Sequence, residues 1–369
     1  MISKEAKGSS GKAFIAIPEE ADDLLSLRRI IELGDNVVAD TTRVIKQIKE
    51  YARPDKGDRI NVTLSIRVTN MTLDDVVDRI RIGGNIISSS SEFVSRGAHH
   101  SLTVQLGDTI VIDKHRKWND FEIGMLRKSG IALIFVLVAV DTQEAAVARV
   151  SGTHLEIIPN IYSGQSGKRY QQSIKNNPTV DTFFGEIAKT ISALSKKGFE
   201  ENNQNQRMII FGPGETKRRL YNSLVTKYEF NREYVSVIDG VDVAGEDGIF
   251  VFLRSTAMKE SMHSSKLSIV SSILDDIMRL VNKGEAKYCM GMEEVSLAAS
   301  GNAIEYAVFS DSIFKTVEEN SFIKLLNSIE SRGAKVFAVD STTDVGLRVS
   351  ALGGIVALLR YAIHLRSLG

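Results

Sequence analysis

Ile131-Ala-Leu-Ile-Phe-Val-Leu-Val-Ala-Val140 is the stretch that decides the fold at the centre of this chain of 369 residues. All of its residues are apolar and many are β-branched, a pattern typical of a strand that is buried on both faces of a sheet. It is also the longest apolar run, and it is far shorter than the roughly 20 residues that a membrane-spanning helix needs. The sequence therefore predicts a core strand here and no membrane span.

The residues around this strand predict an α/β domain over residues 129–257. Phe183, Ile187, Ile191 and Leu194 recur at the spacing of one helix face, which predicts an amphipathic helix. We expect that helix over Val180–Lys197 and further strands at Ala145–Val150, Leu155–Ile158 and Met208–Phe211.

The last of these strands runs into Gly212-Pro213-Gly214, and a helix follows that begins with Lys217, Arg218 and Arg219. A strand, a glycine turn and a helix form the setting of many nucleotide-binding turns. The glycine spacing matches neither the dinucleotide motif nor the phosphate-loop motif, and Pro213 lacks an N–H donor, so a structural turn is favoured. Cations at a helix start oppose the helix dipole and suggest an external anionic partner.

The loop Ile161-Tyr-Ser-Gly-Gln-Ser-Gly-Lys-Arg-Tyr170 has two interpretations that the residues leave open. Its backbone N–H groups could cradle a phosphate. Alternatively, a solvated turn could present Lys168 and Arg169 to an anionic partner.

Residues 1–128 predict a small antiparallel barrel. Val62, Leu64, Ile66 and Val68 are apolar at every second position, which indicates a strand with one buried face. Short strands separated by polar turns are typical of such barrels. The other elements expected here are strands at Lys12–Ile17, Asn36–Thr41, Arg79–Ser88, Ser101–Val104 and Thr109–Asp113, and helices at Asp22–Leu33 and Asn119–Lys128.

A basic hairpin loop is expected over Arg43–Arg59, between two of these strands. It contains six cations and only three carboxylates, and such a loop can neutralise phosphates of a nucleic acid. An ordinary solvated loop is the alternative, because charged surface loops are common. The six cations are Arg43, Lys46, Lys49, Arg53, Lys56 and Arg59.

Arg79 and Arg81 are two residues apart, so they lie on one face of their predicted strand. The neighbouring His99 and His100 suggest a metal, but adjacent strand residues point to opposite faces and no third ligand has the required spacing. A structural or RNA-stacking role is therefore favoured for the two histidines.

Residues 258–369 alternate helices with strands, which predicts a three-layer α/β/α domain. The whole chain is thus expected to be a multidomain α+β and α/β protein. Cys289 lies in a predicted strand without a nearby cation, which favours a packed thiol over a nucleophile. The expected helices are Ser264–Val281, Met292–Ser300, Ser321–Arg332 and Asp344–Leu352, and the expected strands are Ala286–Met290, Glu305–Phe309, Lys335–Val339 and Ile355–Tyr361.

Composition limits the function classes. The chain has 46 basic and 46 acidic residues, so nucleic-acid binding has to come from local patches rather than from the net charge. A single cysteine excludes an internal disulfide and a cysteine-built zinc site, and it suits a reducing cytoplasm. The polar start of the chain, Met1–Lys12, has no apolar core of a signal peptide.

Several motifs, in this order along nearly the whole chain, resemble the Pelota/Dom34 family, paralogues of the class-1 translation release factors. The first segment contributes Asp78-Arg-Ile-Arg-Ile82 and Arg96-Gly-Ala-His-His-Ser-Leu102. The middle contributes Tyr162-Ser-Gly-Gln-Ser-Gly-Lys168 and Phe211-Gly-Pro-Gly214. The last segment contributes Met262-His-Ser-Ser265, Phe309-Ser-Asp-Ser-Ile-Phe314 and Gly353-Gly-Ile-Val-Ala-Leu-Leu-Arg-Tyr361.

This resemblance implies an Sm-like β-barrel, a central α/β domain and a C-terminal domain like that of kink-turn-binding ribosomal proteins. It implies a cytoplasmic, monomeric, tRNA-shaped factor that enters the A site of stalled ribosomes and promotes their dissociation in no-go mRNA surveillance. The implied partners are ribosomal RNA and mRNA, a GTPase of the archaeal elongation factor 1 alpha type, and an ABC-type recycling ATPase. The basic hairpin would then probe the decoding region, with Arg79 and Arg81 on ribosomal RNA nearby.

Release factors hydrolyse peptidyl-tRNA through Gly-Gly-Gln in the middle domain, and this tripeptide is missing here because Ser163 precedes Gly164-Gln165. The resemblance therefore implies rescue without peptide release and without a cofactor. Lys168, Arg169, Pro213, Gly214, Lys217 and Arg218 are the expected contacts with the GTPase or ribosome. Relatives carry an aromatic after Pro-Gly, whereas this chain has Glu215, which puts that contact in doubt.

An alternative function is a divalent-metal-dependent endoribonuclease, which some family members have been described to be. Metal-assisted cleavage needs clustered carboxylates. Asp74, Asp75 and Asp78 form the compact acidic set of the barrel segment, although turn or helix-start roles are favoured for them.

Overall fold

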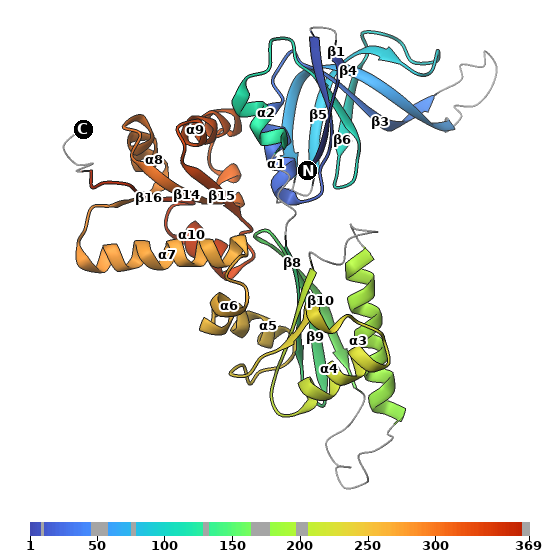
Figure 1. Cartoon of the computed structure of the whole chain (residues 1–369). Coiled ribbons are helices and arrows are strands. Elements are labelled where there is room, and N and C mark those ends of the chain that lie inside the picture. The colour runs from blue at the N-terminus through green and yellow to red at the C-terminus, as the bar shows by residue number, and fades with distance from the viewer. Residues whose placement is uncertain are drawn as a thin grey trace. The chain divides into compact units, whose positions relative to one another are not determined.

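The computed structural model describes residues 1–8, 11–45, 58–74, 79–127, 133–163, 178–196 and 206–363 (Figure 1). The chain divides into two compact units. The first unit comprises Met1–Gly130 with Val317–Asn327, and the second comprises Ile131–Thr316 with Ser328–Gly369. Among the described residues, no helix has the length and apolar character needed to cross a membrane.

The first unit is built on an antiparallel seven-stranded sheet in the order β1-β2-β7-β3-β4-β5-β6. Val62, Leu64, Ile66 and Val68 are buried on one face of β4, as their spacing predicts. The unit contains β1 (Ile2–Gly8), β2 (Gly11–Ile17), α1 (Ala21–Ile30), β3 (Asn36–Ile45), β4 (Asp58–Asp74), β5 (Arg79–Ser89), β6 (His99–Val104), β7 (Ile110–Asp113) and α2 (Asp120–Arg127).

This sheet curls on itself. The Thr41 hydroxyl on β3 lies 3.3 Å from Nε2 of His100 on β6, although two strands separate β3 from β6 in the pairing order. The predicted barrel-like domain is therefore confirmed. β1 was not expected from the sequence, because Ile2–Gly8 carries few apolar residues.

Two buried arginines of α1 hold the residues 317–327 in the first unit. The Arg28 guanidinium, 3% exposed, pairs with Glu319 and donates to Oδ1 of Asn320 at 2.8 Å. Nε of Arg29 donates to Oδ1 of Asn327 at 2.8 Å, and the Asn327 amide donates back to the Arg29 carbonyl at 3.1 Å. The first part of α9 (Glu319–Ser331) thus belongs to the N-terminal unit.

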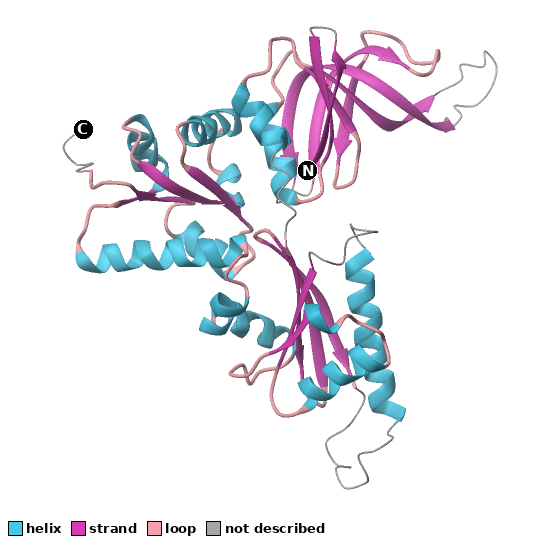
Figure 2. Cartoon of the chain, in the orientation of Figure 1, coloured by secondary structure: helices cyan, strands magenta, loops and turns pink. Residues whose placement is uncertain are grey.

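In the second unit, β8 (Ile134–Val140) is buried on both faces, as predicted. Val136, Val138 and Val140 pack against the helices α3 and α4, whereas Phe135 and Leu137 belong to the core on the opposite face. The sheet has the order β10-β9-β8-β11-β12, with β8 parallel to β11. Figure 2 shows its strands in magenta and the neighbouring helices in cyan. Its elements are β9 (Glu144–Ser151), β10 (His154–Tyr162), α3 (Pro178–Lys196), β11 (Gln206–Phe211), α4 (Thr216–Thr226), the 3-10 turn Arg232–Tyr234, β12 (Val235–Val237) and α5 (Gly245–Arg254).

A second sheet of this unit has the order β13-β16-β14-β15, and α7 and α10 pack on one of its faces around Val308 and Val356. Helices and strands alternate along this part of the chain, as the sequence predicts. The elements are α6 (Thr256–Ser261), α7 (Lys266–Lys283), β13 (Tyr288–Met290), α8 (Gly291–Ser300), β14 (Ile304–Ser310), the 3-10 turn Asp311–Lys315, β15 (Lys335–Val339), α10 (Asp344–Ala351) and β16 (Ile355–Leu359).

One hydrophobic core runs through the second unit from the first sheet to the second. Phe252 of α5 and Met258 of α6 lie in it together with Val308 of β14. The expected boundary between residues 257 and 258 falls within α6, so contacts alone do not separate these two sheets into domains. That boundary stays a prediction.

Candidate nucleic-acid interface

Three exposed arginines, Arg59, Arg67 and Arg81, share the outer face of β4 and β5, and we call them the arginine face. Apolar residues alternate with them and point into the core. Arg81 lies opposite Thr72 of β4 and Thr103 of β6 in the sheet register. Among the outer-face positions of β4, β5 and β6 whose side chains the structure describes, none is a carboxylate. On the neighbouring strand β3, the exposed Asp40 lies opposite Thr63 and accepts a hydrogen bond from its hydroxyl at 2.6 Å. Three arginines and one carboxylate leave this surface with a local excess of positive charge on a neutral protein.

The arginine face agrees in part with the residues expected to bind RNA. Arg81 is exposed and Arg79 is half-buried on the same strand, as their spacing predicts. Arg67 was missed, because its strand was interpreted only through its apolar positions. The sequence does contain a signal for Arg67. The residues between the apolar positions of β4 are mostly polar, and Arg59 and Arg67 are both among them, on one face of the strand.

The basic hairpin is shorter than predicted. β3 and β4 stay paired as far as Ile45 and Asp58, so Arg43 and Arg59 lie in strands rather than in a loop. The backbone groups of both residues belong to segments paired in the ladder between β3 and β4. Lys46, Lys49, Arg53 and Lys56 lie outside the described residues.

His99 and His100 differ in exposure, as expected for neighbours on a strand. Burial lowers the pKa of His100, and the electrostatic influence of Arg43 and of the neighbouring His99 lowers it further. His100 is therefore neutral at pH 7 and is bonded to Thr41. The geometry favours a structural role for His100 and leaves His99 on the outer face.

The acidic set of the barrel is only partly described. The backbone of Asp74 ends β4 opposite Arg79, but its side chain is not described, and Asp75 and Asp78 lie outside the described residues. The structure therefore supplies no metal geometry for this set.

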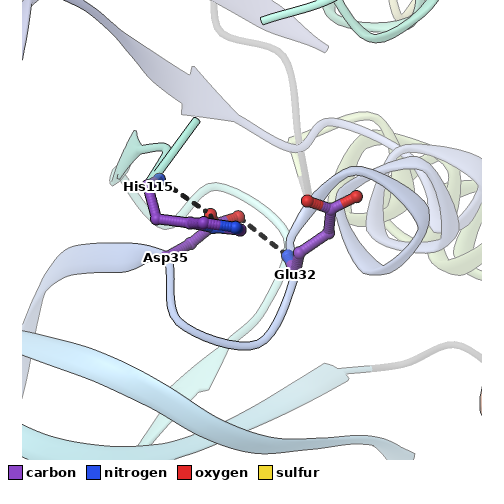
Figure 3. A group of neighbouring side chains, drawn as sticks. All are labelled: Glu32, Asp35 and His115. Carbon is purple, nitrogen blue, oxygen red and sulfur yellow. Dashed lines mark hydrogen bonds and ion pairs between the residues drawn. The ribbon is translucent and has the colours of Figure 1, made fainter. Parts of the chain in front are cut away.

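A different group in the first unit has the composition of a metal site. Glu32, Asp35 and His115 offer ligand atoms that all lie within 4.8 Å of one another (Figure 3). Nδ1 of His115 lies 2.7 Å from Oδ1 of Asp35. Sequence reasoning missed this group, because His115 follows Asp35 only 80 residues later in the chain.

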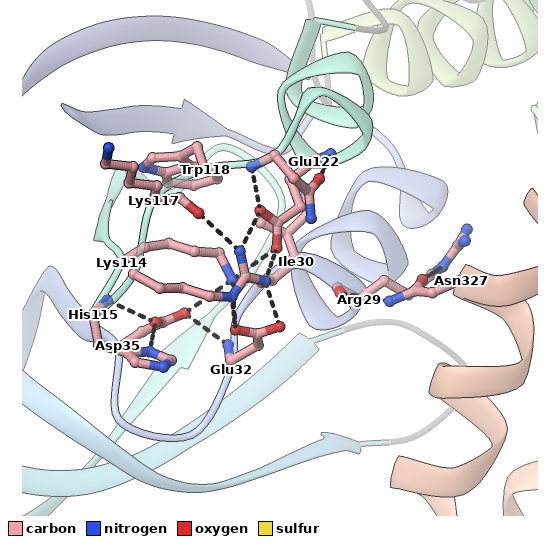
Figure 4. Close-up of polar contacts among 12 residues, drawn as sticks. Arg29, Ile30, Glu32, Asp35, Lys114, His115, Lys117, Trp118, Glu122 and Asn327 are labelled. Carbon is pink, nitrogen blue, oxygen red and sulfur yellow. Dashed lines mark hydrogen bonds and ion pairs between the residues drawn. The ribbon is translucent and has the colours of Figure 1, made fainter. Parts of the chain in front are cut away.

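Internal cations already neutralise these carboxylates (Figure 4). Nζ of Lys114, which is fully buried, lies 3.3 Å from Oδ2 of Asp35 and 3.0 Å from Oε1 of Glu122. Arg116 pairs with Glu32 and with Glu122, each at 2.6 Å. We call these residues the Lys114 cluster: Glu32, Asp35, Lys114, His115, Arg116 and Glu122.

The protonation of the Lys114 cluster fits salt bridges rather than a metal. Burial raises the pKa of Glu32, but hydrogen bonding to Arg116 and the charge of Lys114 outweigh it, so the pKa is lowered overall. The two carboxylates raise the pKa of Arg116. A divalent cation would have to displace a buried ammonium, so these residues do not fit a metal ion.

The glycine turn after β11 is structural, as the spacing predicts. Gly212 has a φ of +136°, and a Cβ on it would lie 2.1 Å from the carbonyl oxygen of Val140. Only glycine allows β11 and β8 to approach in this way. Pro213 is half-buried and Gly214 is exposed.

Lys217 differs from its expected exposed position. It is buried, and its Nζ donates to the Gly212 carbonyl at 3.0 Å and lies 2.7 Å from Oδ1 of Asp239. Arg218 is exposed and pairs with Glu215 and Asp239, each at 3.3 Å. Asp239 of the same chain therefore neutralises part of the positive charge at the start of this helix. Of Lys217 and Arg218, only Arg218 is exposed.

The glycine-rich loop of the central sheet begins at a buried serine. The Ser163 N–H donates to the Gln143 carbonyl at 2.8 Å, and its hydroxyl donates to the Thr142 carbonyl at 2.9 Å. Ser163 is thereby fixed to the turn between β8 and β9. Lys168 and Arg169 lie outside the described residues.

Comparison with known proteins defines the class. Residues 1–130 match the Pelota N-terminal domain, and residues 268–363 match eRF1 domain 3. A curled antiparallel sheet followed by mixed sheets and an eRF1-type end defines a multidomain factor related to translation termination factors.

Relatives identify the family. The chain is 48% identical over 348 residues to the protein pelota homolog of Nitrosopumilus maritimus, covering 94% of this chain and 96% of that one. It is 33% identical over 366 residues to the protein pelota homolog of Pyrococcus furiosus, covering 97% and 99%. The chain belongs to the Pelota family.

A solved Pelota structure shares the fold. The Thermoplasma acidophilum Pelota protein aligns with a TM-score of 0.59 at 22% identity, covering 95% of this chain and 96% of that one. The chain is also similar to a model of ribosome-bound archaeal Pelota and ABCE1, over 98% of this chain and 100% of that one, at 24% identity and a TM-score of 0.46.

Proposed function

We propose that this protein recognises stalled ribosomes and promotes their dissociation without hydrolysing peptidyl-tRNA. Membership of the Pelota family over almost the whole chain carries this proposal. The missing Gly-Gly-Gln tripeptide supports the second part, because Ser163 stands where the first glycine would be needed. Rescue of this kind needs binding and not chemistry, so we propose no cofactor.

The arginine face and the hairpin beyond it would bind ribosomal RNA. Each arginine that neutralises a phosphate releases counterions, so the affinity should fall as salt rises. Arg59 extends the arginine face toward the hairpin, where Lys46, Lys49, Arg53 and Lys56 follow in sequence. We propose that this surface contacts the decoding region and the mRNA.

The proposed partners are the ribosome, a GTPase of the elongation factor 1 alpha type and an ABC-type recycling ATPase. A model of ribosome-bound archaeal Pelota and ABCE1 suggests the ribosome and the ATPase among these partners. Of the residues expected to contact the GTPase or ribosome, the exposed Gly214 and Arg218 and the half-buried Pro213 stay in the proposal together with Lys168 and Arg169. The buried Lys217 leaves it. We further propose a cytoplasmic monomer.

The nuclease alternative is not proposed. The metal-type group that the structure describes is occupied by Lys114 and Arg116, and Asp74, Asp75 and Asp78 have no described carboxylate geometry.

A splitting assay tests the proposal. Stalled ribosomes carrying a labelled peptidyl-tRNA are mixed with the protein, the GTPase and the ATPase, and both subunit separation and peptide release are measured. Wild-type protein should separate the subunits and release no peptide.

The hairpin is tested by replacing residues 46–57 with Asn-Gly, a two-residue turn that joins paired strands. This variant should lose splitting, whereas the exposed control Lys12→Met should retain it. Splitting by the shortened variant would exclude the hairpin from recognition, and peptide release by the wild type would overturn the no-release proposal.

A further inference from the structure

Phe93 has the highest exposure of the large apolar side chains in the described residues, at 79%. It lies in the loop that joins β5 to β6. The next residue, Val94, is buried at 6% exposure. The loop backbone is therefore anchored to the core by Val94, and the Phe93 side chain projects into solvent.

Hydrogen bonds fix this loop. The Gly97 N–H donates to the Ile86 carbonyl at 2.8 Å, and the Ile86 N–H donates to the Ala98 carbonyl at 2.9 Å. The Thr63 N–H on β4 donates to the Ser90 hydroxyl at 3.0 Å. Thr63 lies on β4 between Arg59 and Arg67, so the loop is tied to the strand that carries two members of the arginine face.

The surroundings of Phe93 are polar and carry charges of both signs. Arg96 is exposed in the same loop, and the arginine face lies on the sheet to which the loop is tied. Glu92, the residue before Phe93, is an exposed carboxylate, and Asp40 of β3 accepts a hydrogen bond from the Thr63 hydroxyl at 2.6 Å. A lone ring among polar residues is unlike the contiguous apolar patch that binds proteins. An aromatic ring beside cations is the composition that binds single-stranded RNA, where rings stack on bases and cations hold phosphates.

We propose that Phe93 stacks on an unpaired base of single-stranded RNA while the arginine face binds the phosphates of the same strand. This inference rests on the proposed function, because it specifies how the surface assigned to ribosomal RNA or mRNA reads its ligand. The fixed loop backbone supports it, because the loop itself loses little conformational entropy on binding. Glu92 opposes the neighbouring phosphates, so Glu92→Gln should bind RNA more tightly than wild type.

The test is a double-mutant cycle in which the Phe93 ring is replaced in the protein and the bases are removed from the RNA. Full-length protein is titrated into a fluorescein-labelled single-stranded RNA and into the same RNA with abasic positions, and anisotropy is read. Phe93→Ala and Phe93→Leu should each weaken binding to the normal RNA about fivefold or more, whereas Phe93→Tyr should retain it. On abasic RNA, Phe93→Ala and wild type should bind equally.

Salt dependence separates the two roles. Arg67→Ala should reduce the slope of log affinity against log salt by about 0.7, because one phosphate contact is lost, and Phe93→Ala should leave the slope unchanged. The control Leu106→Ala, another exposed apolar residue of the first unit, should match wild type in both measurements.

Three results would overturn the inference. Phe93→Ala could bind normal RNA as tightly as wild type, or it could lose equal affinity for normal and abasic RNA. It could also lose ribosome splitting with unchanged RNA binding, which would point to a protein contact. Wild-type splitting of stalled ribosomes is measured separately. The proposed function can therefore hold when the stacking inference fails, and the stacking inference can hold when the proposed function fails.

Discussion

Gly212 is a position at which the backbone dictates the residue. Its left-handed φ and the Val140 carbonyl 2.1 Å from the site of a Cβ make Gly212→Ala both strained and sterically blocked. We expect a loss of stability of about 1–3 kcal/mol or more, seen as faster amide exchange in β8 and β11. Gly214→Ala is the matched control, since its φ is +65° but no atom lies within 4 Å, and it should cost about 1 kcal/mol. Equal exchange in the two variants would contradict this explanation.

The single cysteine reports on the opening of β13. Burial raises the pKa of the Cys289 thiol to about 12, and the negative charge of Glu294 adds to this effect. At pH 8 the folded thiol is protonated and inaccessible, so alkylation should require local unfolding and should accelerate with denaturant. Rapid alkylation of the native protein would contradict the buried position.

The same pKa shift has a consequence at alkaline pH. The unfolded thiol ionises near pH 8.5, whereas the folded thiol keeps its proton to about 12. The contribution to stability is therefore full below about pH 8.5 and falls as pH rises through this window. The free energy of unfolding of wild type minus that of Cys289→Ala should decrease from pH 8 to pH 10, and a constant difference would show that the shift is absent.

Lys217 shows why residue roles were harder to predict than strands. A run of three cations at a helix start suggests charges without a partner in the protein. The fold nevertheless brings Asp239, which is 22 residues after Lys217, into ion pairs with Lys217 and Arg218. The local spacing of residues does not predict these ion pairs. The exposed Arg218 next to the buried Lys217 likewise depends on the tertiary fold and not on composition.

At the scale of elements, the Lys114 cluster joins α1, α2 and the end of β7. Lys114→Met would leave the buried Asp35 and Glu122 without their ammonium, and the expected loss is about 3–5 kcal/mol in the first unit. The exposed pair of Lys12 and Glu5 supplies the control, because Lys12→Met should change stability by less than about 0.5 kcal/mol. Calorimetric unfolding measures both. Equal stability of the two variants would mean that the cluster is dispensable.

A metal titration tests the same cluster. Because Lys114 and Arg116 neutralise the carboxylates, Mg²⁺ or Mn²⁺ should not raise the unfolding midpoint of the wild-type protein. A saturable rise with metal concentration that is lost in Glu32→Gln would contradict the salt-bridge interpretation.

Strands and helices with a clear period were predictable. β8 was found as an uninterrupted apolar run, and β4 was found through its apolar alternation. β1 was missed because an exposed edge strand needs few apolar residues, and its pairing with β2 supplies its order. The Lys114 cluster was missed because its residues come from segments about 80 residues apart. The sequence nevertheless offers one signal, the basic run Lys114-His-Arg-Lys117 directly after β7.

At the scale of the whole molecule, the first unit is discontinuous in sequence. Arg28→Ala should release residues 319–327, because Glu319 and Asn320 lose their buried partner. Faster amide exchange in this segment is the expected result, and Arg279→Ala, which removes an exposed pair with Asp276, should leave it unchanged. Unchanged exchange in Arg28→Ala would show that the arginine does not hold the segment.

The discontinuous unit also has a consequence for synthesis on the ribosome. Residues 317–327 leave the ribosome roughly 200 residues after the rest of the first unit. At about 5–20 residues per second, the nascent barrel would wait on the order of 10–40 s with Arg28 and Arg29 uncovered. A protein that we propose to act on stalled ribosomes would itself finish folding its first unit only when its own translation is nearly complete.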